Sequence, residues 1–125
     1  MMDLDSTIPS GKYNAVIIET DLNYSLHGRV LNLTFRITEG RYKNSIVTDH
    51  IITRNKNKTA ERIGLKQVKR LCAITDTKYP LIPKKNKDVK ITVGIVQHYL
   101  DKHINVNKIL FYNVKSDLKE KNATW

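Results

Sequence analysis

The chain has 125 residues, which is enough for one domain and too few for two ordinary ones. Apolar residues make up 40% and charged residues 27%, so a buried core is possible and global disorder is not expected. Lys and Arg number 22 against 12 for Asp and Glu, a net charge of +10. A single cysteine, Cys72, excludes an intramolecular disulfide and any multi-cysteine metal site.

The expected location is the cytoplasm, without a membrane anchor. No uncharged apolar run is long enough to form a membrane-spanning helix. The first five residues are acidic and lack the apolar stretch of a secretory signal. A lone thiol is also typical of proteins from a reducing compartment.

The positive charge is concentrated in one part of the sequence. Residues 54–90 contain twelve basic and three acidic side chains, so this stretch carries +9 of the net +10. A surface that serves only solubility mixes both signs along the chain. A localised positive charge instead favours a polyanionic partner, with nucleic acid ahead of a membrane surface. A solvated helix face in a Lys-rich protein is the alternative interpretation.

The first half of the chain predicts three strands. Residues 1–10 form a polar lead, which we expect to be flexible. Residues 11–20 are rich in β-branched side chains and predict the first strand, followed by a polar loop over 21–28. Residues 30–38 alternate cleanly, with one apolar set (Leu31, Leu33, Phe35, Ile37) and one polar set (Asn32, Thr34, Arg36). A third strand is predicted over 45–53, where Ile46/Ile52 and Val47/Ile51 compete for the inner face.

The second half predicts one helix and two more strands. The helix begins near Thr59, a suitable N-cap. Its apolar arc is Ala60, Ile63, Gly64, Val68, Leu71 and Cys72, opposite the basic residues Arg62, Lys66, Lys69 and Arg70. A long connection over 75–88 leads to a strand over 89–96, whose predicted inward residues are Val89, Ile91, Val93 and Ile95. A loop over 98–103 and a fifth strand over 104–112 precede a charged tail, 113–125.

The resulting order, β-β-β-α-β-β, is that of the OB-fold, a five-stranded Greek-key barrel that is partly open. We therefore predict an all-β domain with one helix over residues 11–112. Such barrels bind oligonucleotides on strands two and three and on the loops that join strands 1–2 and 4–5. Other β-rich sandwiches with one helix share the same element order.

Several segments resemble a phage protein family that is catalogued as a domain of unknown function. Residues 11–17 match its opening strand, G-x-Y-x-A-x-I, and residues 31–40 match the strand L-x-L-x-F-x-I-x-x-G. Residues 41–44 resemble the turn that follows, and residues 69–74 resemble the end of its helix. Members are treated as single-stranded DNA-binding proteins with OB-like folds, so the resemblance implies that function and fold for residues 11–112.

The tail departs from a common feature of single-stranded DNA-binding proteins. Many of them end in an acidic segment with a terminal aromatic residue that recruits partners. Here Trp125 is terminal and aromatic, but lysines outnumber acids over 113–125. The role of the tail therefore stays open.

Non-specific binding of a single strand requires cations along the phosphates and aromatic rings on which bases stack. The predicted loops and turns supply candidate rings, and the polar face of the second strand supplies hydrogen-bonding groups. Basic residues lie close to both. The candidate nucleic-acid-binding residues are Tyr24, His27, Arg29, Asn32, Thr34, Arg36, Tyr42, Lys43, Arg54, Lys56, Lys58, His98, Tyr99 and Lys102. We assign Tyr13, Phe35 and Phe111 to the core, because they alternate with polar residues.

Enzyme motifs are not evident in the sequence. The four histidines do not form a helical metal-binding pair, and the five glycines form neither phosphate-binding loop pattern. Asp88-Val89-Lys90 is a fragment of a nuclease motif without a partner carboxylate, and Asp49 beside His50 is more typical of a surface or turn pair. We therefore expect no catalytic residue, cofactor or metal.

The sequence favours a cytoplasmic, non-sequence-specific single-stranded DNA-binding protein of phage DNA replication or recombination. Phage replication or recombination proteins are its expected further partners, and the oligomeric state stays undetermined. An RNA-binding protein, or a protein-interaction module of a phage replication complex, is the alternative.

Overall fold

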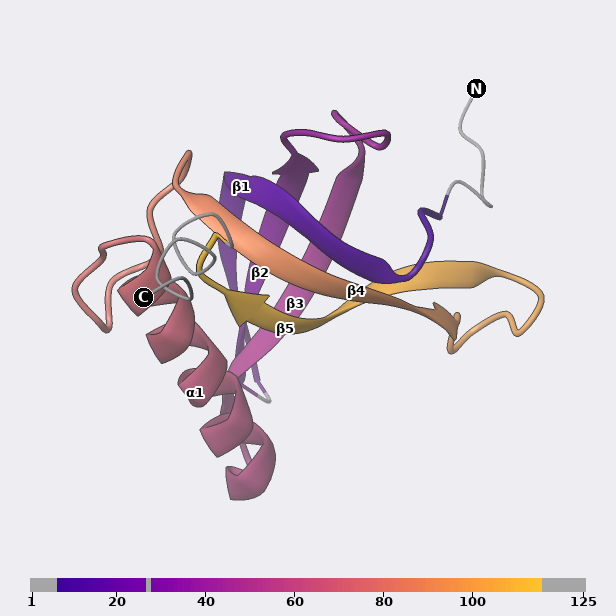
Figure 1. Cartoon of the computed structure of the whole chain (residues 1–125). Helices are drawn as coiled ribbons and strands as arrows, with labels where there is room; N and C mark the ends of the chain where they lie inside the picture. The colour runs from indigo at the N-terminus through magenta and orange to yellow at the C-terminus, as the bar shows by residue number, and fades with distance from the viewer. Residues whose placement is uncertain (1–6, 27, 116–125) are drawn as a thin grey trace.

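The computed structural model describes residues 7–26 and 28–115 of the chain, and it is mostly β-structure with one helix. The elements are β1 (Gly11–Ser25), β2 (Gly28–Ile37), β3 (Ile46–Asn55), α1 (Lys58–Ile74), β4 (Asp88–Gln97) and β5 (Asn105–Asn113). The predicted element order is confirmed. Figure 1 shows the strands as one strongly curved sheet with α1 beside it.

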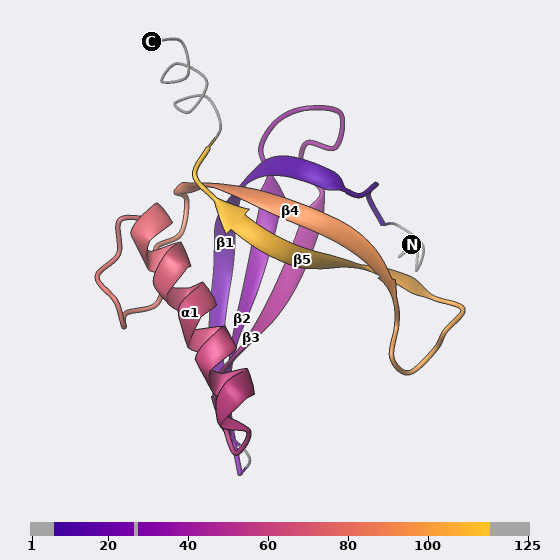
Figure 2. The same cartoon turned by 60° about the horizontal axis from the view of Figure 1, so that its bottom comes forward.

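The sheet has the strand order β3-β2-β1-β4-β5, and neighbouring strands in this order pair antiparallel. β1 is central because its first part pairs with β4 and most of its length pairs with β2. The sheet is not closed: among the described residues no hydrogen-bonded ladder joins the edge strands β3 and β5. Figure 2 shows the β4–β5 hairpin crossing over the other three strands, so that the two edges approach each other.

The core fills the concave side of this sheet. The alternation predicted for the second strand is confirmed, because Leu31, Leu33, Phe35 and Ile37 are all buried. In β3 the inner residues are Val47 and Ile51, which settles the choice that the sequence left open. The core also begins earlier than the strand pattern indicated. Ile8 is buried, and its backbone N–H donates to Asn107 Oδ1 over 2.9 Å.

β1 is longer than predicted. The segment 21–28, expected to be a polar loop, instead continues β1 to Ser25 and turns directly into β2. Leu22 points inward and pairs with Leu31, whereas Asp21 and Asn23 are exposed. A run with one apolar member among polar residues looks like a loop in sequence, but here it is the end of a hairpin.

Three residues that the sequence patterns assign to inner faces are exposed, and the first is Ile63 of the predicted helix arc, at 58%. Phe111 is 65% exposed because a β-bulge in the β4–β5 pairing leaves Leu110 without a partner, and the inward aromatic residue is Tyr112. Ile95 is 43% exposed, and it lies where the β4–β5 hairpin projects beyond the rest of the sheet, as Figure 1 shows.

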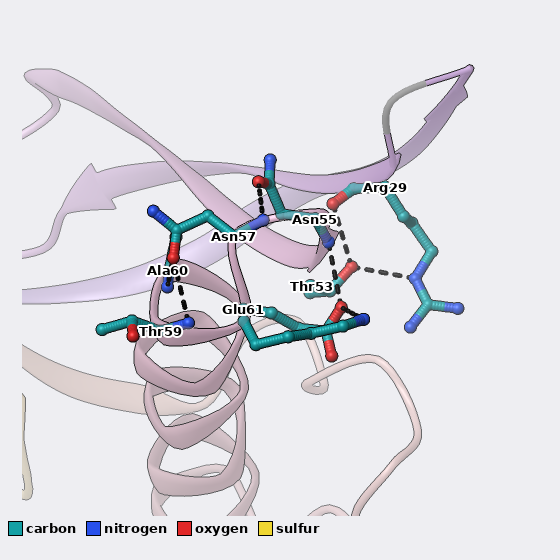
Figure 3. Close-up of polar contacts among 8 residues, drawn as sticks. Arg29, Thr53, Asn55, Asn57, Thr59, Ala60 and Glu61 are labelled. Carbon is teal, nitrogen blue, oxygen red and sulfur yellow. Dashed lines mark hydrogen bonds and ion pairs between the residues drawn. The ribbon is translucent and has the colours of Figure 1, made fainter.

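α1 begins at Lys58, and its N-cap is Asn57, two residues before the predicted N-cap Thr59. The Asn57 side chain accepts hydrogen bonds from the backbone N–H groups of Thr59 (3.0 Å) and Ala60 (3.2 Å), as Figure 3 shows. Glu61 accepts from the backbone N–H of Asn55, which joins the helix start to the end of β3. No helix within the described ranges is long and apolar enough to cross a membrane.

Gly64 allows α1 to lie directly against β3. A Cβ atom at this position would lie 1.6 Å from the backbone carbonyl oxygen of Ile52. The interior glycine therefore has a packing role that outweighs its low helix propensity.

Replacing Gly64 by Ala should destabilise the protein, although alanine is the better helix former by about 1 kcal/mol. The added methyl group forces the helix away from β3, and overpacking of this kind costs about 1–3 kcal/mol. Chemical denaturation measures the free energy of unfolding. Lys69→Ala, on the exposed side of the same helix, is the control and should change it by less than about 0.5 kcal/mol. An equally or more stable Gly64→Ala variant would contradict the close contact.

Candidate nucleic-acid interface

The outer face of β2 and β3 carries a band of polar side chains. Asn32 and Thr34 project from β2, and they pair in register with His50 and Thr48 of β3. The His50 ring nitrogen Nδ1 is hydrogen-bonded to Asn32 Oδ1, which joins the two strands through their side chains. Arg36 continues the band and donates a 3.4 Å hydrogen bond to Asn44. The predicted polar face of the second strand is therefore present.

This polar band leads into a groove at the open edge of the sheet. The groove has a volume of about 520 Å³ and lies between β3 and the β4–β5 hairpin. Its β3 side consists of Thr48, Asp49 and His50, and its hairpin side consists of residues 96–99 and 106–108. Because β3 and β5 are not joined by a ladder, the side chains along both edges are accessible to a ligand.

His98 and Tyr99 form a stacked pair of rings beside the groove. Their centroids are 5.1 Å apart and the planes differ by 21°. The backbone N–H of Leu100 donates to His98 Nδ1, and that of His103 donates to Asp101, so the loop is held by its own hydrogen bonds. Tyr99 is 86% exposed. Its ring is thus supported from one side and accessible to solvent, which suits a stacking platform.

The contact that joins the two edges is between Asp49 and Tyr112. The Tyr112 hydroxyl donates to Asp49 Oδ2, and the Tyr112 ring stacks on Phe35 with a centroid separation of 5.6 Å. Burial raises the pKa of Asp49 above its usual value, and the hydrogen bonds from Tyr112 and the His50 backbone oppose this shift. Asp49 thus belongs to the interior of the groove, and its interpretation as a surface or turn residue is corrected.

The pKa of Asp49 predicts a pH effect on stability. The folded protein holds the Asp49 proton more tightly than the unfolded chain, so ionisation costs stability as the pH rises from about 4 through the folded-state pKa. Asp49→Asn removes that cost and keeps an oxygen that accepts from Tyr112. The difference in unfolding free energy between variant and wild type should therefore shift in favour of the variant from about pH 4 to pH 7.

Denaturation curves at several pH values measure this difference. Tyr112→Phe is the complementary variant: it removes a donor that lowers the pKa of Asp49, so its stability should fall more steeply over the same pH range. An Asp49→Asn protein that loses stability relative to wild type as the pH rises would contradict the assigned environment of Asp49.

Three predicted residues have structural contacts away from the groove. Tyr42 is partly buried against Tyr13, with ring centroids 6.1 Å apart in an edge-to-face arrangement. Arg29 lies on the inner side of the sheet, and its Nε donates to Thr53 Oγ1 over 2.8 Å, as Figure 3 shows. Lys58 forms a 3.5 Å ion pair with Glu61 at the helix start.

The remaining candidates are distributed along the molecule. Lys43 lies in the β2–β3 turn, and Lys102 lies in the same loop as Tyr99. Arg54 is the second-last residue of β3, and Lys56 follows the strand, close to the start of α1. Tyr24 is exposed at the end of the β1–β2 hairpin, and both ribbon views show that this end and the β4–β5 loop lie apart. His27 lies outside the described residues.

Sequence reasoning missed part of the groove. Gln97 and Lys108 of the β4–β5 hairpin line it together with Thr48 and His50. The alternation of β3 could have indicated that Thr48 and His50 face outward. It did not, because the pairs Ile46/Ile52 and Val47/Ile51 predict opposite inner faces. Two acids were also missed: Glu19 and Asp21 of β1 share the outer face with Thr34 and Asn32, respectively. They reduce the positive charge of the band.

Comparisons with known proteins do not identify a family, because no family model matches the chain and no curated protein is significantly similar to it. Within residues 7–26 and 28–115, no group of three or more His, Cys, Asp or Glu side chains is placed to hold a metal ion.

Proposed function

We propose that the protein binds single-stranded DNA with little sequence preference, through the groove between β3 and the β4–β5 hairpin and the adjoining outer face of β2 and β3. The supporting observation is the stacked His98–Tyr99 pair, with Tyr99 exposed, across the groove from the polar residues Thr48 and His50. A base can stack on the Tyr99 ring, while the amide, hydroxyl and imidazole groups accept or donate hydrogen bonds along the strand.

The arrangement of elements supports an OB-type barrel. The helix lies between β3 and β4 in sequence, β1 pairs with both β2 and β4, and β3 and β5 are brought together by side chains. In an OB-fold, oligonucleotides bind on strands two and three and on the 4–5 loop. The proposed interface occupies these elements. The resemblance of residues 11–17 and 31–40 to the phage family agrees with this proposal.

Electrostatic attraction supplies the second part of the mechanism. Lys102 and Lys108 belong to the β4–β5 hairpin, and Arg36 stands on the outer face of β2. The larger share of the charge, in residues 54–90, belongs mainly to α1 and the connection that follows it. We infer that these distant cations increase the rate of encounter with DNA, whereas the groove residues make the contacts.

In this proposal the protein acts in the cytoplasm of a phage-infected cell, where it covers strands exposed during DNA replication or recombination. It has no catalytic step and needs no cofactor. Binding neutralises phosphate charge and releases counterions, so its affinity depends on salt.

Tyr99→Ala should weaken binding to an oligo-dT strand by about 5- to 150-fold, because loss of a stacked base costs about 1–3 kcal/mol. Fluorescence anisotropy across a salt series measures the affinity. The slope of log K against log salt should stay the same for Tyr99→Ala, whereas Arg36→Ala should make it shallower by about one unit if Arg36 contacts a phosphate.

Tyr24→Ala is the matched control, because it removes an exposed tyrosine ring that lies apart from the groove. Its effect on DNA affinity should be smaller than that of Tyr99→Ala, and neither change should lower the melting temperature. Equal affinity of wild type and Tyr99→Ala for oligo-dT would refute the proposed interface. Equal or tighter binding of an RNA oligomer would transfer the proposal to RNA.

A further inference from the structure

A second groove, distinct from the proposed DNA interface, lies where α1 meets the end of β5. It has a volume of about 420 Å³ and is lined by Ile63, Lys66, Gln67 and Arg70 of α1 and by residues 110–112 of β5. None of its lining residues is acidic. Figure 2 shows α1 running beside the end of β5 at this position.

The groove collects large apolar side chains that are exposed to solvent. Phe111 is 65% exposed and Ile63 is 58% exposed, and Leu110, which also lines the groove, is exposed as well. A single exposed apolar residue is ordinary. Several in one groove, surrounded by polar residues, indicate a surface that another molecule covers.

Positive charge surrounds this apolar surface. Arg70 is fixed in place by two hydrogen bonds of 2.5 Å. Its Nε donates to the Tyr112 carbonyl oxygen, and its Nη2 donates to Asn113 Oδ1. Lys66 has no ion-pair partner in the described part of the chain. Arg62 and Lys69 add to the charge of the helix. Glu61, the one acid of α1, is bonded at the helix start to Asn55 and Lys58.

We propose that this groove binds an acidic peptide segment with hydrophobic side chains, supplied by a partner protein. The hydrophobic side chains would fill the space between Ile63, Leu110 and Phe111, and the carboxylates would pair with Lys66 and Arg70. Charge complementarity selects this occupant. A second copy of the chain is disfavoured as the occupant because its net charge is +10. The chain's own residues 116–125 are disfavoured because they hold two acids and two bases and so carry no net negative charge.

Nucleic acid fits the groove less well than such a peptide. Stacking needs a flat ring, and two of the three exposed apolar residues, Ile63 and Leu110, are aliphatic. Aliphatic side chains beside one aromatic ring are suited to the side chains of a peptide. The basic residues of α1, which do not line the DNA groove, thereby have a binding partner of their own.

The test uses the full chain and a fluorescein-labelled synthetic peptide of about ten residues that alternates aspartate with leucine and phenylalanine. Anisotropy should show saturable binding. Phe111→Ala and Lys66→Glu should each weaken it at least about tenfold, a loss typical of residues at the centre of an interface. Two control peptides, one with lysine for aspartate and one with alanine for the apolar residues, should not bind.

Lys69→Glu is the matched control variant, because it changes the net charge of α1 by the same amount without changing a groove residue. It should retain most of the peptide affinity. An equal loss in Lys69→Glu and Lys66→Glu would overturn the proposal in favour of a general charge effect, and absence of saturable binding to wild type would also overturn it.

Three further results would show a different occupant and overturn the proposal. If Phe111→Ala loses oligo-dT affinity while its peptide affinity is unchanged, the occupant is DNA. If wild type self-associates and Phe111→Ala does not, the occupant is a second copy of the chain. If shortening the chain to residues 1–115 increases peptide affinity, the occupant is the chain's own C-terminal segment. The peptide experiments contain no DNA, so their outcome is separate from that of the proposed DNA-binding function.

Discussion

The contact between Asp49 and Tyr112 determines how the two edges of the sheet meet. Tyr112 is buried and stacks on Phe35, and its hydroxyl reaches the half-buried carboxylate of Asp49 on β3. This side-chain contact joins β5 to β3 where no backbone ladder does. The edges stay close, yet the side chains beside the contact remain open to solvent.

The two grooves differ in the chemistry of their walls. Residues 106–108 of β5 face the polar groups Thr48 and His50, whereas residues 110–112 face the helix residues Ile63 and Lys66. A polar groove with an exposed, supported aromatic ring is suited to a nucleic-acid strand. An apolar groove with basic surroundings is suited to an acidic peptide. The same edge strand thus lines both grooves, and we propose that one binds DNA and the other an acidic peptide.

Local sequence patterns predicted most of the secondary structure. The period-two alternation of β2 and the helical spacing of Val68, Leu71 and Cys72 correctly predicted which side chains are buried. The errors arose where tertiary contacts, and not the local pattern, determine the orientation of a side chain or the packing of an element. The bulge at Leu110 reversed the orientation of Phe111, and nothing in the local pattern indicates a bulge. The close approach of Gly64 to Ile52 depends on how α1 packs back against β3, which the helical pattern does not indicate.

The candidate site was harder to predict than the fold, for a related reason. The exposed aromatic residue of the 98–103 loop could be named from its polar surroundings, but its position across from Thr48 and His50 depends on how the hairpin folds over β3. Arg29 and Tyr42 look available in sequence, and the structure uses them for internal contacts with Thr53 and Tyr13. Residue type alone does not distinguish these roles.

The most direct measurement of the central claim is an NMR titration of the isotope-labelled chain with oligo-dT, which reports which backbone amides change their environment. We expect the largest chemical-shift changes on residues 48–50 and 97–99, with smaller changes on the outer face of β2. Changes confined to α1 and residues 110–112, or no saturable change, would contradict the account.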